Sequence, residues 1–228
     1  MVTVAQSRPS ERAKFIQKTY LHLAGAVGAF ILVEFFLFQT GIAAALTEFV
    51  AASRFSWLLI LGAFMLLGWL ARGLAARADS TSTQYAGLGI YVVLEALIFA
   101  PILYIAAYFS DPSVIPTAAI LTLLMFAGLT AVVFISRKDF SFLGSILTIG
   151  GFIALGVIIC SALFGFTLGL FFSFIMVVFA AGAILYDTSN VLHHYSTNQY
   201  VAASLELFAS VALLFWYVLQ IVMSLSRR

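Results

Sequence analysis

The segment GAILYDTSNVLHHY, residues 182–195, places one carboxylate, Asp187, directly after a run of Phe, Val, Ala and Ile. Long apolar runs are typical of helices that span a bilayer, where a carboxylate is costly. Asp187 is therefore either the end of a membrane helix that meets water or a functional group. The rest of the chain is needed to choose between these two interpretations.

The composition indicates that this chain resides in a membrane. Of its 228 residues, 64% are hydrophobic and 9% are charged, whereas an average soluble protein is about 45–50% apolar and about 25% charged. The net charge of +2 is small and the basic residues are scattered, which argues against nucleic acid as a partner. The single cysteine, Cys160, excludes an intrachain disulfide and fits neither a redox pair nor a zinc site.

Seven apolar segments, each near the roughly 20 residues that a spanning helix needs, predict an all-α integral membrane protein. We place them at 18–39, 54–74, 85–109, 113–136, 142–163, 166–189 and 201–225. The connections are short, so the chain divides into an N-terminal tail, 1–17, and one transmembrane domain, 18–228. The first run is too long for a signal-peptide core and lacks a cleavage motif, which predicts an uncleaved helix.

The distribution of basic residues predicts a cytoplasmic N-terminus. Eight of the eleven Lys and Arg residues lie on the predicted inner side: Arg8, Arg12, Lys14, Lys18, Arg72, Arg77, Arg137 and Lys138. Arg54 and the terminal pair, Arg227 and Arg228, lie on the other side. Seven spans would put the C-terminus there, and the terminal pair argues mildly against it. A six-span form with a re-entrant last segment is the alternative.

This topology places three charged residues at a similar depth. Arg72 ends the second predicted span, Asp187 ends the sixth and Glu206 opens the seventh, so all three should lie near the cytoplasmic edge and could meet. Residues three, four and seven apart share a helix side, and both acidic residues share theirs with small residues. Small residues mark close helix packing, which favours carboxylates that face the bundle. Carboxylates that reach out to interfacial water are the alternative.

Glu95 is the acidic residue predicted to lie deepest in the membrane. It lies about ten residues into the third segment, or about 15 Å at 1.5 Å per residue. An ionised carboxylate there costs at least a few kcal/mol unless it is paired, hydrated or protonated, so Glu95 is a functional candidate. Glu34, toward the far end of the first segment, is either functional or a hydrated rim residue. His193 and His194 are adjacent and point about 100° apart on a helix, which argues against a shared metal and for a wet loop.

Enzyme motifs are absent from the sequence. We find no G-x-S-x-G elbow, H-E-x-x-H pair, phosphate-binding glycine loop or cysteine cluster, and therefore predict that the protein is not an enzyme. An intramembrane hydrolase built from Asp187, one of the two histidines and a serine such as Ser189 is the alternative.

Three segments have distinctive motifs: QKTYLHLAG at 17–25, FISRKDFSFLGSIL at 134–147 and GAILYDTSNVLHHYSTNQYVAASL at 182–205. They resemble signature stretches of the transmembrane Bax inhibitor motif family, in its bacterial branch. VLEALIFAPIL at 93–103 is similar to the third-helix segment of that family. The resemblance covers nearly the whole chain, and the RKDFSFLG and LYDTSN stretches are its most specific parts.

This resemblance implies a bundle of six helices around a central seventh, in the inner membrane of the cell, and a pH-sensitive leak of calcium ions. In the family, an aspartate matched by Asp187 shares a proton with an aspartate of the last helix, and an arginine, plausibly Arg72, helps to hold the closed form. Phe208 occupies the position of the second aspartate in the segment 204–208. Glu206, two residues earlier, could restore the pair if the helix is rotated. Ca²⁺ would be transported cargo, and no cofactor is expected.

A second bacterial subgroup of the same family lacks that aspartate and binds and modulates a membrane-anchored AAA protease. Two hypotheses therefore remain open. The first is a proton-gated cation leak whose gate involves Asp187, Glu206, Arg72 and Glu95. The second is a regulator in the lipid bilayer that docks against a membrane protease or another membrane protein.

Overall fold

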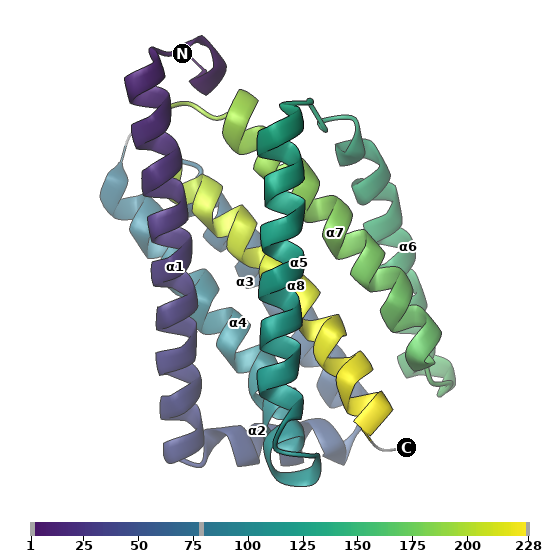
Figure 1. Ribbon diagram of the computed structural model, residues 1–228. Helices are drawn as coiled ribbons and strands as arrows, with labels where there is room; N and C mark the ends of the chain where they lie inside the picture. The colour runs from purple at the N-terminus through teal and green to yellow at the C-terminus, as the bar shows by residue number, and fades with distance from the viewer. Residues whose placement is uncertain (1–2, 78–79, 227–228) are drawn as a thin grey trace.

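Seven helices of the computed structural model, which describes residues 3–77 and 80–226, are long and apolar enough to cross a membrane. Figure 1 shows them as one bundle: α1 (Pro9–Gln39), α3 (Arg54–Ala75), α4 (Thr81–Phe109), α5 (Val114–Ser136), α6 (Leu143–Phe164), α7 (Gly169–His193) and α8 (Tyr200–Ser226). A short 3₁₀ turn, η1 (Val4–Gln6), precedes α1, and α2 (Ile42–Ala52) follows it. The prediction of an all-α membrane fold with seven spans is confirmed.

Several of the predicted helix boundaries differ from the structure, and the start of α1 differs most. α1 begins at Pro9, within the predicted tail, because proline is well suited to the first turn of a helix, where its missing N–H is not needed. α7 continues to His193, beyond the predicted end at 189. Hydropathy detects only the part of a helix that lies in lipid, so polar turns that extend a span are missed.

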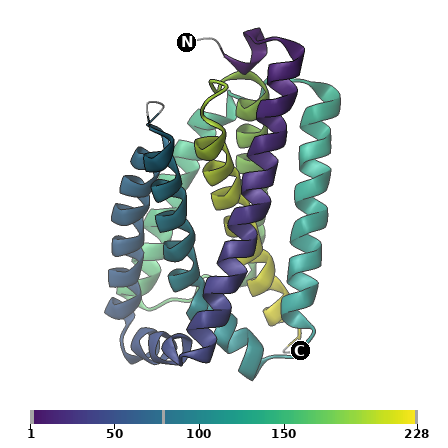
Figure 2. The ribbon, with the colours of Figure 1, turned by 90° about the vertical axis from the view of Figure 1, so that its left-hand side faces the viewer.

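The short helix α2 was not predicted. It runs across the lower end of the bundle between α1 and α3, as Figures 1 and 2 both show. Gly41, with φ of +77°, supplies the left-handed turn that redirects the chain into α2. The helix packs against α1, α3 and α4, and Ala43 is fully buried there. Its apolar run is too short for a span, so the sequence analysis treated it as a connection.

Helix α8 occupies the centre of the bundle, in agreement with the predicted arrangement. It packs against α1, α3, α4, α5 and α7. α6 differs from the other outer helices, because among the described residues it packs against α3 and α7 and its backbone stays away from that of α8. One side of the central helix is therefore less tightly covered than the others.

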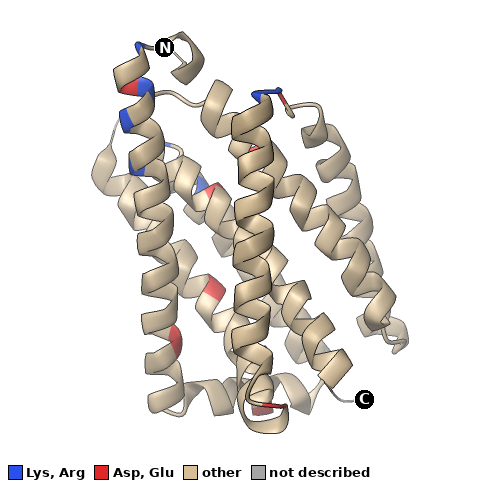
Figure 3. Ribbon diagram, viewed as in Figure 1, with Lys and Arg blue, Asp and Glu red and all other residues tan. Residues whose placement is uncertain are grey.

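The two ends of the bundle differ in their charged residues and in the chain end that each one carries. The N-terminus and the end of α8 lie at opposite ends of the bundle (Figure 1), and lysines and arginines gather at the N-terminal end (Figure 3). α8 is one continuous helix of 27 residues, which favours seven spans over a re-entrant last segment. Arg227 and Arg228, which the topology prediction invoked, lie outside the described residues.

Candidate functional site

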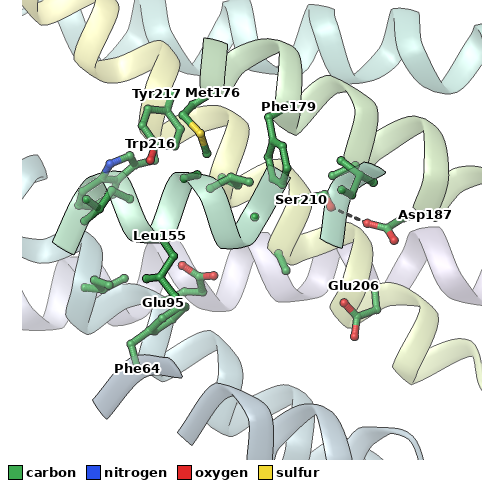
Figure 4. A pocket seen from close by; sticks show the side chains of 18 of the residues that line it. Phe64, Glu95, Leu155, Met176, Phe179, Asp187, Glu206, Ser210, Trp216 and Tyr217 are labelled. Atoms are coloured by element: carbon green, nitrogen blue, oxygen red, sulfur yellow. Dashed lines mark hydrogen bonds between the residues drawn. The ribbon is translucent and has the colours of Figure 1, made fainter. Parts of the chain in front are cut away.

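A cavity of about 570 Å³ lies between α3, α4, α6, α7 and α8. Its walls are mostly apolar, and its charged lining residues are the four that the sequence singled out: Arg72, Glu95, Asp187 and Glu206. The structure therefore brings together the residues that were predicted to lie at a similar depth, with Glu95 in addition. Figure 4 shows the carboxylates of Glu95, Asp187 and Glu206 along this cavity.

Asp187 is held inside the bundle by a hydroxyl group of the central helix. It is 8% exposed, and its Oδ2 accepts a hydrogen bond of 2.5 Å from the Oγ of Ser210 on α8 (Figure 4). α7 continues for more than a turn beyond it, to His193. Asp187 is thus not a helix terminus that reaches water, which was the alternative interpretation of its position.

Glu206 is paired with a cation that comes from α3. Its carboxylate forms an ion pair with the Nη1 of Arg72. The Nη2 of Arg72 also donates a hydrogen bond of 3.1 Å to the hydroxyl of Tyr91, whose ring centroid lies 5.1 Å from the guanidinium carbon. Both charged side chains remain partly exposed, at 40% for Arg72 and 28% for Glu206. Arg72 therefore links α3, α4 and α8 at one end of the cavity.

The two acidic residues of α7 and α8 thus have different partners. Asp187 meets Ser210, and Glu206 meets Arg72. Phe208 does not face Asp187, because it is 3% exposed and packs edge-on against Phe30 and Tyr91 at centroid distances of 6.1 and 6.4 Å. The residue of α8 that contacts Asp187 is therefore Ser210 and not Phe208, which the motif match placed at the position of the second aspartate. Two residues correspond to a rotation of about 200° on a helix.

Glu95 and Glu34 are both buried acidic residues, but only Glu95 lines the cavity. Glu95 is 5% exposed and lies beside Phe64 and Leu155 (Figure 4). Glu34, on α1, is 7% exposed, and neither carboxylate oxygen has a hydrogen-bond partner among the protein atoms. Glu34 is therefore buried within the bundle and lies outside the cavity.

The two histidines lie where α7 ends and meet the loop between α5 and α6. The Nε2 of His194 lies 3.1 Å from Oδ2 of Asp139, and the Nδ1 of His193 lies 3.0 Å from the carbonyl oxygen of Ser189. The backbone N–H of Ser141 donates to Oδ1 of Asp139 at 2.9 Å, and this bond is the main cause that lowers the pKa of Asp139 below its usual value. The contact between His194 and Asp139, together with the hydrogen bond that the backbone N–H of Phe140 donates to Ser189, fastens the α5–α6 loop to α7.

In the hydrolase alternative, Asp187 would join a histidine and Ser189, and in the described residues the Oγ of Ser189 lies 3.5 Å from the Nδ1 of His193 while Asp187 has a different partner. Ser189 is fully buried and donates to Asp139 at 3.3 Å, while Asp187 accepts from Ser210. Residues 3–77 and 80–226 also contain no group of three His, Cys, Asp or Glu side chains that could hold a metal ion.

Ser210 and Tyr91 are two polar residues of the site that were not predicted as site residues. Ser210 lies one turn beyond Glu206, and Tyr91 lies one turn before Glu95. Because residues four apart share a helix face, both could have been found as polar neighbours of the acidic residues. What the spacing cannot reveal is which partner each group takes.

Comparison with known proteins identifies the family. The family profile described as "Inhibitor of apoptosis-promoting Bax1" matches residues 12–227, nearly the whole chain. The chain belongs to the Bax inhibitor family. The resemblance inferred from the sequence motifs is thereby confirmed. The region matched by the Bax inhibitor profile includes all or most of each of the seven spans. It also includes the four charged residues of the cavity.

Individual members of the Bax inhibitor family are also similar to this chain. Bax inhibitor 1 of Schizosaccharomyces pombe is 32% identical over 230 residues, which cover 96% of this chain and 79% of that protein. The Modulator of FtsH protease YccA of Escherichia coli K12 is 35% identical over 133 residues, or 57% of this chain and 59% of that protein. An uncharacterized protein of Pseudomonas aeruginosa is 41% identical over 110 residues, so the matched region spans about half of each chain, 48% and 49%.

Proposed function

We propose that the protein is a pH-sensitive cation leak whose gate is formed by the carboxylates of the cavity. The observation that carries the proposal is the position of Glu95, Asp187 and Glu206 on one cavity within the membrane spans. Carboxylate oxygens are the ligands that a hard cation such as Ca²⁺ prefers. Protonation removes the charge that attracts the cation, so the leak responds to pH.

The ion pair between Arg72 and Glu206 is the closing element in this proposal. It connects α3 to α8 and occupies one end of the cavity. Because Arg72 neutralises Glu206, the charge that a passing cation meets further along comes from Asp187 and Glu95. Opening then requires Arg72 to leave Glu206, and the hydroxyl of Tyr91 offers it a second hydrogen-bond partner on α4.

Calcium flux in liposomes that contain the purified protein tests this proposal. Asp187→Asn should remove or strongly reduce the pH dependence of the flux while membrane insertion stays intact, since loss of a charge lowers the insertion cost. Glu34→Gln is the matched control, because it removes a buried acidic residue that does not line the cavity. Unchanged flux and pH dependence in Asp187→Asn would show that Asp187 is not the gate.

A gain-of-function variant makes the test more specific. Ser210→Asp would place a second carboxylate in contact with Asp187, and two carboxylates in contact share one proton. We expect the flux of this variant to show a stronger pH response than that of the unaltered protein. Phe208→Asp should not do so, because Phe208 faces Phe30 and Tyr91.

A second candidate function is the modulation of a membrane-anchored AAA protease. The similarity to a relative that is named for modulating the FtsH protease favours it, as does a serine at the position that faces Asp187. The test is the degradation rate of a membrane substrate by a purified protease of this class, with and without the protein. A changed rate together with no calcium flux would favour this function over the leak.

The proposed location is the inner membrane of the cell, with the N-terminus in the cytoplasm. This orientation is proposed because basic residues gather at the N-terminal end of the bundle (Figure 3), and basic residues favour the cytoplasmic side. A reporter fused after Arg228 should then lie outside the cytoplasm, and one inserted in the loop between α7 and α8 should lie inside it. Both reporters on one side would contradict the seven-span topology.

A further inference from the structure

The cavity has a second part, which consists of aromatic side chains and lies away from Asp187 and Glu206. It includes Trp57 of α3, Phe99 of α4 and Trp216 of α8. The rings of Trp57 and Trp216 are stacked at a centroid distance of 5.8 Å, and Trp216 meets Phe99 edge-to-face at 5.0 Å. Figure 4 shows Trp216 at the opposite side of the cavity from Asp187 and Glu206. The calcium leak proposed above makes no use of this aromatic wall.

Glu95 lies between the aromatic wall and the polar end of the cavity. It is 5% exposed and reaches the lumen beside Phe64 (Figure 4). The cation on the cavity lining, Arg72, is already held by Glu206 and by the hydroxyl of Tyr91. Glu95 thus combines near-complete burial, a position on the cavity and the lack of an ion pair in the described structure.

Aromatic faces and a carboxylate in one enclosed site recognise organic cations. The negative face of an indole or phenyl ring attracts an ammonium group, and the attraction grows when both groups are removed from water. Apolar walls such as Leu155 and Met176 accommodate the hydrocarbon part of such a ligand. The volume of about 570 Å³ falls within the roughly 300–1,000 Å³ of small-molecule sites.

We propose that this cavity is a binding site for an organic cation with an apolar body, such as a quaternary ammonium compound. The cationic group lies against Glu95, and the apolar body lies along the aromatic wall in the space between α6 and α8. This binding does not depend on calcium flux, because it requires only the cavity, the aromatic wall and Glu95.

A pair of ligands that differ only in charge tests the proposal. Phenyltrimethylammonium and the neutral tert-butylbenzene have nearly the same shape, so the comparison isolates the effect of the positive charge. Binding of each is measured by equilibrium dialysis against the full chain in lipid nanodiscs, with empty nanodiscs subtracted. We expect saturable binding of the cation and at least about tenfold weaker protein-dependent binding of the neutral compound. Equal binding of the two compounds would mean that the cavity selects only for apolar shape and would overturn the proposal.

Variants then locate the site. Glu95→Gln keeps the side-chain shape and should weaken cation binding by about tenfold, and Trp216→Leu should weaken it by several-fold. Glu34→Gln is the control and should leave binding unchanged, because Glu34 is a buried acidic residue outside the cavity. Thermal unfolding of each variant separates loss of binding from loss of fold. Cation binding that is the same in Glu95→Gln and Trp216→Leu as in the unaltered protein would place the ligand elsewhere and refute the assignment.

Discussion

Helices α8 and α6 both line the cavity but differ in how many of their residues are buried. Sixteen of the 27 residues of α8 are buried, whereas Ala154 alone is buried among the described residues of α6. Yet α6 is the more apolar of the two helices. In a bilayer, the outward face meets lipid rather than water, so high hydropathy marks exposure to lipid as readily as burial in protein. Small and polar residues indicate the interior more reliably.

The difference between these helices divides the bundle into two regions. In the packed region, α8 meets α1, α4 and α5, while the cavity region lies where α6 faces α8 at a distance. Packing of side chains should dominate the stability of the first region. The second region carries the four charged residues and should tolerate substitution better.

Leu214→Ala should destabilise the protein by about 2–5 kcal/mol, because it leaves a void in the packed region. Leu214 is fully buried on α8 in the cluster that contains Ile184 and Leu219. Ile149→Ala on α6 is the matched control, since Ile149 is 63% exposed on the outer surface. Unfolding in denaturant, with the protein in detergent micelles, measures both variants. Similar losses for the two would contradict the division into regions.

Gly87→Ala should cost about 1–3 kcal/mol through overpacking between α4 and α3. A methyl group at Gly87 would lie 2.5 Å from the carbonyl oxygen of Ala71 and 2.6 Å from the backbone nitrogen of Ala75. Backbone atoms cannot move aside as a flexible side chain can, so the two helices would have to separate. Gly89→Ala, with no atom within 4 Å of the added methyl, should instead be neutral or stabilising by up to about 1 kcal/mol. Melting temperatures of the two variants provide the comparison, and a stable Gly87→Ala variant would show that α3 is not closely packed here.

The seven spans could be predicted from the sequence because their determinant is local. A run of about twenty apolar residues is sufficient, whatever the rest of the chain does. The helix α2 could not be predicted in the same way, because its position depends on packing against α1, α3 and α4. The start of α1 at Pro9 was missed for another reason, since polar residues can continue a helix beyond the lipid.

The candidate site could be predicted as a group of residues but not as a set of pairs. Depth in the membrane, which sequence position determines, correctly brought Arg72, Asp187 and Glu206 to one cavity. Partner choice depends on the rotation of α8 about its axis, which long-range packing determines. The motif match placed Phe208 at the position of the second aspartate, whereas the residue of α8 that bonds to Asp187 is Ser210. Rotations of this kind are not encoded in any local pattern.

Removal of the ion pair between Arg72 and Glu206 should have a smaller effect than the packing variants. In a double-mutant cycle of Arg72→Met and Glu206→Gln, we expect a coupling energy of about 1 kcal/mol, because both side chains are partly exposed and the pair is screened. The cycle of Arg72→Met with Asp187→Asn is the control and should give less than half of that value, since Asp187 bonds to Ser210. Equal coupling in the two cycles would mean that Arg72 is shared between both carboxylates.

The smallest effect is expected for Asp139, which fastens the α5–α6 loop to α7 outside the spans. Asp139→Asn should cost no more than about 1 kcal/mol near neutral pH, because the carboxylate is largely exposed. Asp111→Asn is the control, since the carboxylate of Asp111 accepts a hydrogen bond from the backbone N–H of Ser113 in its own loop. The free energy of unfolding, measured for both variants, should fall more for Asp139→Asn, because that substitution also weakens the contacts with Ser189 and His194.

The pH dependence of the stability loss in Asp139→Asn distinguishes a contribution of the carboxylate charge from a contribution of side-chain fit. The backbone hydrogen bond from Ser141 lowers the pKa of Asp139 in the folded protein. A group whose folded pKa is lowered stabilises the protein above its unfolded pKa, about 3.9 for aspartate, and the contribution is lost as pH falls through the folded value. The stability difference between the unaltered protein and Asp139→Asn should therefore shrink as the pH falls below the unfolded pKa of aspartate. A difference that persists unchanged at pH 3 would mean that the fit of the loop against α7, rather than the carboxylate charge, provides the stabilisation.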